Sequence, residues 1–204
     1  MAGKLPGGAI ESGTIEITKL NSSLTNQITS SAGPKVTNLI YFGSNTSARA
    51  SGNQTITVLG SNFAFGTGDI TIECWFYHTS RSTTATLFSN ANDTLNLYIN
   101  TSGVFGVYDG SVRNSSQTVP LNSWNHFAYV RSSGTAKLYY NGTEVLSFSS
   151  STNYAASSAR IGLNYGGGSG SDYATGYIDD FRITRGYARY TSNFTPPSSA
   201  FKDK

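Results

Sequence analysis

Residues suited to sugar binding gather in three stretches that the sequence pattern marks as loops. A tyrosine ring can stack on a sugar, while amide and carboxyl groups hydrogen-bond to its hydroxyls. The three groups are Asn90, Asn92 and Asp93; Tyr108, Asp109 and Arg113; and Asn164, Tyr165, Asp172 and Tyr173. The last group is the strongest, because it flanks the glycine-rich turn 166–170, where a ligand can approach the backbone. We predict a glycan site at Asn164, Tyr165, Asp172 and Tyr173, with Tyr108 and Asp109 as further members.

The acidic residues show no arrangement that fits glycoside hydrolysis. That reaction uses two carboxyl groups, which alternate positions of one strand would place on the same face. The adjacent pair Asp179–Asp180 is expected to point to opposite faces of its strand. The four glutamates are scattered: Glu11, Glu16, Glu73 and Glu144. Since no Gly-x-Ser-x-Gly elbow or phosphate-binding loop occurs either, we expect no catalytic residues and a protein that is not an enzyme.

Metal-ligating side chains are also few. The two histidines, His78 and His126, have no second histidine or acid at ligand spacing, so neither a metal site nor a cofactor is expected. Calcium at a loop rim is the open alternative, and the loop acids available for it are Asp69, Asp93, Asp109 and Asp172. Cys74 is the only cysteine, so the chain forms no internal disulfide. We expect Cys74 and His126 to be packing residues.

The composition narrows the range of partners. Charged residues make up 12% of the chain and the formal net charge is +3, with lysines and arginines scattered along the sequence. Such a distribution does not follow a phosphate backbone, so nucleic acid is not an expected partner. No apolar run is long enough to cross a bilayer, and residues 1–10 lack the apolar core of a signal peptide. We expect synthesis in a cytoplasm without export, and no membrane insertion.

The segments that must position the candidate residues are short and β-rich. The strongest is Ile70–His78, with apolar side chains at alternate positions on one face and Glu73, Trp75 and Tyr77 on the other. Further strands are predicted at 36–42, 54–59, 87–89, 95–100, 104–108, 124–131, 136–140, 143–148, 159–163 and 177–184. This spacing of strands and turns predicts an antiparallel β-sandwich.

Two local signals refine this pattern. Asn141-Gly142 readily takes the positive φ angles of a type I′ turn, so it predicts a hairpin between residues 136–140 and 143–148. The tail Tyr187–Phe201 carries spaced aromatic residues and two prolines. We expect it to lie extended over the sandwich.

The N-terminal residues 1–34 differ from the rest because their apolar residues are sparse. Ile15 and Ile17 alternate as in a strand, and three later apolar residues follow at the spacing of a short helix capped by Thr18. Such a thin apolar stripe cannot bury itself in one monomer, so the segment is either a flexible tail or packs on a partner. We divide the chain into an attachment or oligomerisation arm, residues 1–34, and a sandwich, residues 35–204.

Three motifs resemble those of laminin-G-like domains, a branch of the concanavalin-A-like sandwiches. They are Phe63-Ala64-Phe65-Gly66-Thr67-Gly68-Asp69-Ile70-Thr71-Ile72-Glu73-Cys74-Trp75, then Pro120-Leu121-Asn122-Ser123-Trp124-Asn125-His126-Phe127-Ala128, then Gly176-Tyr177-Ile178-Asp179-Asp180-Phe181-Arg182-Ile183. The resemblance implies an all-β, jelly-roll sandwich. It also implies that the Asp179–Asp180 pair belongs to a family signature, and we expect Arg182 or Arg160 to pair with one of its carboxylates. The ending, Thr184–Tyr190 and Asn193–Pro197, resembles copies found in virion proteins of tailed phages.

The resemblance implies a structural protein on the surface of a bacteriophage virion, either a tail-fibre or a capsid-decoration subunit. Its arm would bind other virion proteins or form a homo-oligomer, with a trimer favoured, and its sandwich would bind host-surface glycans. The alternative is a free-standing carbohydrate-binding or adhesion module with no particle role. For the candidate site residues the competing interpretation is packing, because most of the 13 tyrosines of a sandwich line its core or rim.

Overall fold

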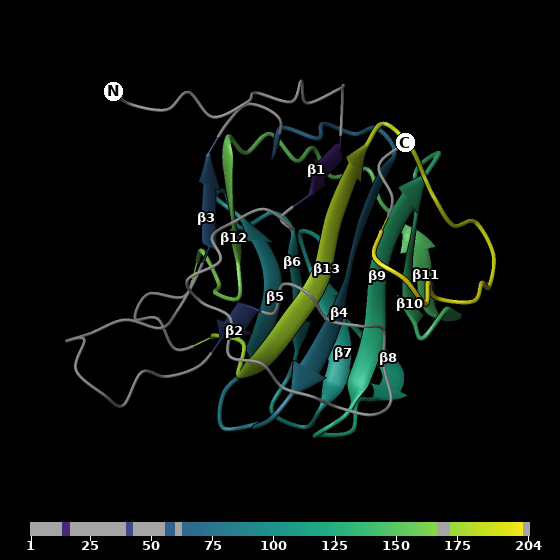
Figure 1. Cartoon of the computed structure of the whole chain (residues 1–204). Helices are drawn as coiled ribbons and strands as arrows, with labels where there is room; N and C mark the ends of the chain where they lie inside the picture. Colours follow the sequence, from purple (N-terminus) through teal and green to yellow (C-terminus); the bar gives the residue numbers. More distant parts are fainter. Residues whose placement is uncertain (1–13, 17–39, 43–55, 60–62, 167–171, 202–204) are drawn as a thin grey trace, which may run out of the picture.

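Two antiparallel β-sheets pack face to face and form a β-sandwich (Figure 1). This is a computed structural model, and it describes residues 14–16, 40–42, 56–59, 63–166 and 172–201. In these ranges no helix is long and apolar enough to cross a membrane. The predicted all-β antiparallel sandwich is confirmed. The short helix predicted after Thr18 lies outside the described residues, and the division at residue 34 stays a prediction.

Sheet A forms the front layer in Figure 1 and sheet B the layer behind it. In spatial order, sheet A contains β1 (Thr14–Glu16), β13 (Gly176–Arg185), β4 (Ile70–His78), β9 (Trp124–Ser132), β10 (Thr135–Tyr140) and β11 (Thr143–Ser149), and β2 (Ile40–Phe42) also pairs with β13. Sheet B contains β3 (Ile56–Leu59), β12 (Ser158–Ile161), β5 (Ala85–Asn90), β6 (Asn96–Ile99), β7 (Val104–Tyr108) and β8 (Val112–Thr118). The chain therefore crosses repeatedly between the two layers.

Most predicted strands occur where the sequence pattern places them. Strand β4 has the predicted bounds, and the turn between β10 and β11 has φ angles of 48° at Asn141 and 79° at Gly142, so the predicted hairpin is confirmed. Strand β8 was not predicted. Its sequence, Val112–Thr118, has almost no apolar alternation because it forms the edge of sheet B. Strand β1 lies inside the predicted arm, yet it pairs with Arg182–Thr184 of β13.

The core fills the space between the inner faces of the two sheets. Alternate residues of β4 point into it, and across the sandwich the rings of Phe105 and Phe127 meet edge to face with centroids 4.9 Å apart. Cys74 and His126 are both buried, as expected, and burial raises the pKa of the Cys74 thiol. Glu73, the neighbour of Cys74, faces away from this core because side chains alternate along a strand.

The C-terminal segment covers part of the outer face of sheet A. In Figure 1 the yellow chain leaves β13 and runs around the side formed by β9, β10 and β11. Tyr190 and Phe194 of this segment pack on Ala128, Val130 and Tyr139. We call residues 187–201 the C-terminal strap. The prediction that this segment lies over the sandwich is confirmed.

Candidate functional site

Residues 163–166 and 172–173 form the base of a hairpin next to β12, and this base contains the strongest predicted site residues. Leu163 and Tyr173 form an isolated β-bridge. The backbone N–H of Asn164 donates to the carbonyl oxygen of Asp172 at 2.9 Å, and its side-chain amide lies 3.5 Å from Asp172 Oδ2. The structure thus brings Asn164, Tyr165, Asp172 and Tyr173 together, all partly exposed.

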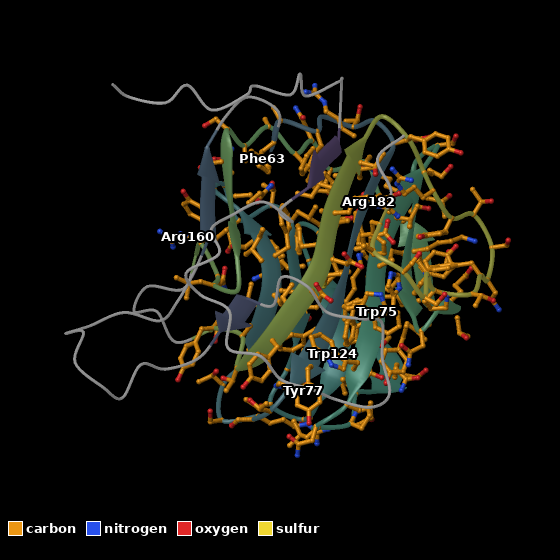
Figure 2. The ribbon with its side chains drawn as sticks, viewed as in Figure 1. Phe63, Trp75, Tyr77, Trp124, Arg160 and Arg182 are labelled. Atoms are coloured by element: carbon orange, nitrogen blue, oxygen red, sulfur yellow. The ribbon has the colours of Figure 1, made fainter. Side chains whose placement is uncertain are left out.

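The same hairpin folds back onto β12 through Arg160. The guanidinium of Arg160 lies 4.0 Å from the ring centroid of Tyr165, a cation–π contact, and its Nη1 lies 3.4 Å from the carbonyl oxygen of Asn164. The Tyr165 hydroxyl is 3.0 Å from Ser158 Oγ, and one of the two oxygens is the donor. Arg160 projects outward from β12 (Figure 2). Tyr165 therefore lies over the outer face of sheet B rather than extending into solvent.

Two carboxylates beside this hairpin lie close enough for their charges to interact. Burial, and then the negative charge of Asp172, raise the pKa of Asp93, which lies in the turn between β5 and β6. A Cβ atom at Gly166 would lie 2.2 Å from Asp93 Oδ2, so any side chain at this position would displace the Asp93 carboxylate. Among the residues that the structure describes, no group of three or more His, Cys, Asp or Glu side chains is arranged to hold a metal ion.

Tyr108 and Asp109, the other two predicted site residues, have side chains on opposite sides of sheet B. Asp109 is only 4% exposed, and its Oδ1 accepts a 2.6 Å hydrogen bond from the Tyr154 hydroxyl, which is itself 2.7 Å from the Tyr129 hydroxyl. The Asp109 carboxylate thus belongs to a polar network inside the sandwich. Tyr108 has the opposite orientation, because its neighbour Val107 is a core residue.

A row of polar side chains crosses the outer face of sheet B and joins the two predicted groups. Arg160 pairs in register with Ser89, Ser89 with Asn96, and Asn96 with Tyr108. Core residues flank Arg160 and Asn96 on both sides, and a core residue precedes Ser89 and Tyr108, so all four side chains face outward. Three strand spacings separate the ends of the row, about 14 Å. Tyr165 and Tyr108 therefore mark opposite ends of one surface.

The interior of this face is polar and incompletely satisfied. Ser89 donates to the carbonyl oxygen of Leu163 at 2.8 Å. Asn96 is 6% exposed and its Oδ1 has no hydrogen-bond partner in the structure, and the same holds for Oγ of the fully buried Thr86. A buried oxygen without a donor costs about 1–3 kcal/mol, so such atoms favour a site that a ligand hydroxyl completes. The alternation of Asn96 and Tyr98 with Leu97 and Ile99 in β6 was the signal that could have identified this face from sequence.

The outer face of sheet A is organised differently, around the buried carboxylate of Glu73. Its Oε1 accepts from Arg182 Nε at 2.9 Å and from Arg182 Nη2 at 2.6 Å. Its Oε2 lies 3.2 Å from His126 Nε2 and accepts from the Tyr190 hydroxyl at 2.8 Å. Burial alone would raise the pKa of Glu73, but the bond to His126 and the charge of Arg182 outweigh it and hold that pKa below its ordinary value.

This arrangement corrects the prediction for the Asp179–Asp180 pair. Arg182 pairs with Glu73, and Arg160 stacks on Tyr165, so neither guanidinium makes the expected ion pair with Asp179 or Asp180. The strand bulges at this point, with Asp180 at a φ of 47°. Burial, and then the charge of Asp180, raise the pKa of Asp179 to about 6.

Aromatic side chains occupy the part of sheet A beyond the buried carboxylate. Figure 2 shows Trp75, Trp124 and Tyr77 following Arg182 along the face, and all three aromatic residues are partly buried. The Tyr77 ring contacts those of Trp124 and Tyr177 edge to face, with centroids 5.6 and 6.0 Å apart. These edge contacts tie β4 to β9 and β13.

Comparison with protein families identifies the superfamily of the chain. The profile of the concanavalin A-like lectin/glucanases superfamily matches residues 49–188. The chain belongs to this superfamily. No curated protein matches the sequence of this superfamily member.

Solved structures resemble the chain in fold at low sequence identity. A putative carbohydrate binding protein from Bacteroides ovatus has a TM-score of 0.56 and 16% identity, over 74% of this chain and 43% of that one. A native heptameric SAP-like pentraxin from Limulus polyphemus has a TM-score of 0.52 and 16% identity, over 71% and 74%. The CBM40 of Ruminococcus gnavus IT-sialidase, bound to α2,3-sialyllactose, has a TM-score of 0.50 and 16% identity, over 62% and 80%.

Proposed function

We propose that this superfamily member binds glycans on the outer face of sheet B. The observation that carries the proposal is the cross-strand row from Arg160 to Tyr108. It places tyrosine rings at both ends of a polar surface whose central Asn96 has a buried, unpartnered oxygen. Rings that stack on sugars and amides that bond to hydroxyls are the groups that this ligand class requires.

The similar structures support this ligand class. The Bacteroides protein is described as a putative carbohydrate binding protein, and the Ruminococcus module was solved with a bound sialyllactose. At 16% identity these likenesses concern the fold, so the argument for this chain rests on its own residues. We propose binding without cleavage, because the sequence supplies no pair of alternating carboxylates on one strand.

A glycan array compared across tyrosine variants tests the proposal. The wild-type chain should bind a subset of oligosaccharides, and Tyr108→Ala and Tyr165→Ala should each lower that binding by about tenfold, the effect of losing one stacking contact. Tyr187→Ala is the matched control, because Tyr187 is half-exposed and belongs to the C-terminal strap of sheet A. An array without signal, or equal losses in all three variants, would contradict a site on sheet B.

We further propose that the sandwich is displayed on a bacteriophage virion, as a tail-fibre or capsid-decoration subunit. The support is the ending of the sequence, from Gly176 to Pro197, which resembles copies in tailed-phage virion proteins. Many copies on one particle would multiply weak single sites into useful avidity. In this proposal residues 1–34 attach the protein to other virion proteins or to further copies of itself, with a trimer favoured.

Light scattering of the full-length chain tests the assembly. A trimer or larger particle is expected, and replacement of Leu20, Leu24 and Ile28 by serine should yield a monomer that keeps β1. A monomeric full-length chain would instead favour a free-standing carbohydrate-binding module. One observation already supports that second candidate: Thr14–Glu16 pairs with β13, so part of the predicted arm belongs to the sandwich itself.

A further inference from the structure

Gly106 leaves one position on the outer face of sheet B without a side chain, and the Tyr98 ring occupies the space. It lies in β7 between the core residues Phe105 and Val107, so its missing side chain would point outward. A Cβ atom there would lie 2.8 Å from two ring carbons of Tyr98 and 2.7 Å from Asn114 Oδ1. The Tyr98 ring therefore lies against the backbone of β7, in space that any other residue would fill.

This position of the ring orients a second side chain. The Tyr98 hydroxyl reaches across Gly106 and donates to Asn114 Oδ1 at 2.9 Å. Burial raises the pKa of Tyr98, which keeps this hydroxyl protonated and therefore a donor. With its oxygen held by Tyr98, the Asn114 amide must turn its NH₂ group away from Tyr98. Asn114 is exposed, so this donor faces solvent.

Asn114 lies next to the Tyr108 end of the polar row. Tyr108 pairs with Val112 and Gly106 with Asn114, so Tyr108 and Asn114 are diagonal neighbours on adjacent strands. Diagonal neighbours have Cα atoms about 7–8 Å apart, a separation that one sugar ring on Tyr108 can bridge. Asn96, with its unpartnered oxygen, stands directly opposite Tyr108 on the other side.

We propose that Gly106 and Tyr98 are positioning residues that make Asn114 the specificity-determining donor of the glycan site. The inference rests on the proposed function. A sugar unit lying on Tyr108 presents an acceptor oxygen, from a hydroxyl, an N-acetyl carbonyl or a carboxylate, to the Asn114 NH₂ group. On its other side a hydroxyl of the same unit donates toward Asn96. The site thereby selects sugars with an acceptor on one side and a donor on the other.

The decisive variant is Asn114→Asp, which keeps the shape and the bond from Tyr98 but replaces the donor by an acceptor. Binding to an array of neutral oligosaccharides, N-acetylated oligosaccharides and α2,3-sialyllactose should fall at least tenfold, while the urea midpoint stays unchanged. Tyr98→Phe should lower binding less, because the Asn114 amide is then free to rotate in either orientation. Asn153→Asp is the control, since it makes the same charge change on an exposed residue between β11 and β12.

Ligand analogues separate a recognition role from a structural one. For each array hit, deoxy and fluoro analogues are titrated against both proteins. One analogue should weaken binding to the wild type yet make no difference in Asn114→Asp, because the lost acceptor and the lost donor form one hydrogen bond. If Tyr108→Ala abolishes binding but Asn114→Asp does not, this inference fails and the glycan site stands. If neither variant changes binding, or if the array has no signal, the proposed function fails with it.

Discussion

The two outer faces of the sandwich differ in how their polar side chains are bonded and covered. On sheet A the buried carboxylate of Glu73 receives hydrogen bonds from Arg182 and Tyr190 and contacts His126, and the C-terminal strap covers the network. On sheet B, Asn96 and Thr86 retain unpartnered oxygens, with Asn114 exposed beside them. Buried atoms without a hydrogen-bond partner occur on sheet A as well, at Trp75 Nε1, His126 Nδ1 and the Tyr139 hydroxyl, so the faces differ mainly in that the C-terminal strap packs on sheet A, the closed face.

The family motifs fall on the closed face. Glu73, His126 and Arg182 come from the three motifs that carried the resemblance, one from each. The residues that line sheet B, such as Asn96, Gly106 and Asn114, belong to none of them. The motifs therefore report the requirements of the fold, and the ligand must be inferred from residues that the family signature does not include.

Removal of the Glu73 charge gives the largest expected change. Glu73→Gln leaves the Arg182 guanidinium buried without a counter-charge, so the free energy of unfolding should fall by about 3–5 kcal/mol. Urea unfolding measures this change in the free energy of unfolding. The control is Glu144→Gln, which breaks a partly exposed ion pair with Lys137 and should cost at most about 1 kcal/mol. Equal losses in the two variants would mean that sheet A is not closed by its network.

Asp179→Asn should have an effect of opposite sign. Its ordinary pKa is 3.8 and the folded value about 6, so the folded chain binds the proton more tightly. Stability from this group is complete below pH 3.8 and is lost as the pH rises to about 6. At pH 7 the asparagine variant should thus be about 2–3 kcal/mol more stable than wild type, with no difference at the acid end. Unfolding curves of wild type and variant at pH 7 and below pH 3.8 test this prediction. If the difference in stability between the two proteins were the same at both pH values, the pKa of Asp179 would not be raised.

The hydroxyl of Tyr190 should contribute measurably to the binding of the strap to sheet A. Tyr190→Phe keeps the ring that packs on Tyr139 and Phe194 but removes the donor to Glu73, which should cost about 1.5–3 kcal/mol. Hydrogen exchange of the backbone amides of residues 187–201 should accelerate in this variant. Tyr187→Phe is the comparison, because the Tyr187 side chain is half-exposed. Unchanged exchange in Tyr190→Phe would show that ring packing and the strap's other hydrogen bonds, such as the one from Phe194 N–H to the Gly142 carbonyl oxygen, hold the strap without this hydroxyl.

The same contrast explains what sequence could predict. Local patterns predicted β4 and the Asn141-Gly142 hairpin, because alternation and turn chemistry act over a few residues. They also placed Asn164 near Asp172, since a hairpin joins them. The bond between Glu73 and Arg182 spans 109 positions and carries no local signal. The sequence likewise does not reveal that Asp109, at the end of a strand, turns inward to Tyr154.

The smallest expected change in stability lies on sheet B, and it tests the comparison most directly. Tyr108 is partly exposed, and Asn114→Asp keeps the acceptor for the Tyr98 hydroxyl, so Tyr108→Ala and Asn114→Asp should each alter the free energy of unfolding by less than about 0.5 kcal/mol. Closed-face variants should show the reverse, with lost stability and unchanged glycan binding per folded molecule. A large stability loss in Tyr108→Ala would mean that this face is built for packing, and that its tyrosines need no ligand.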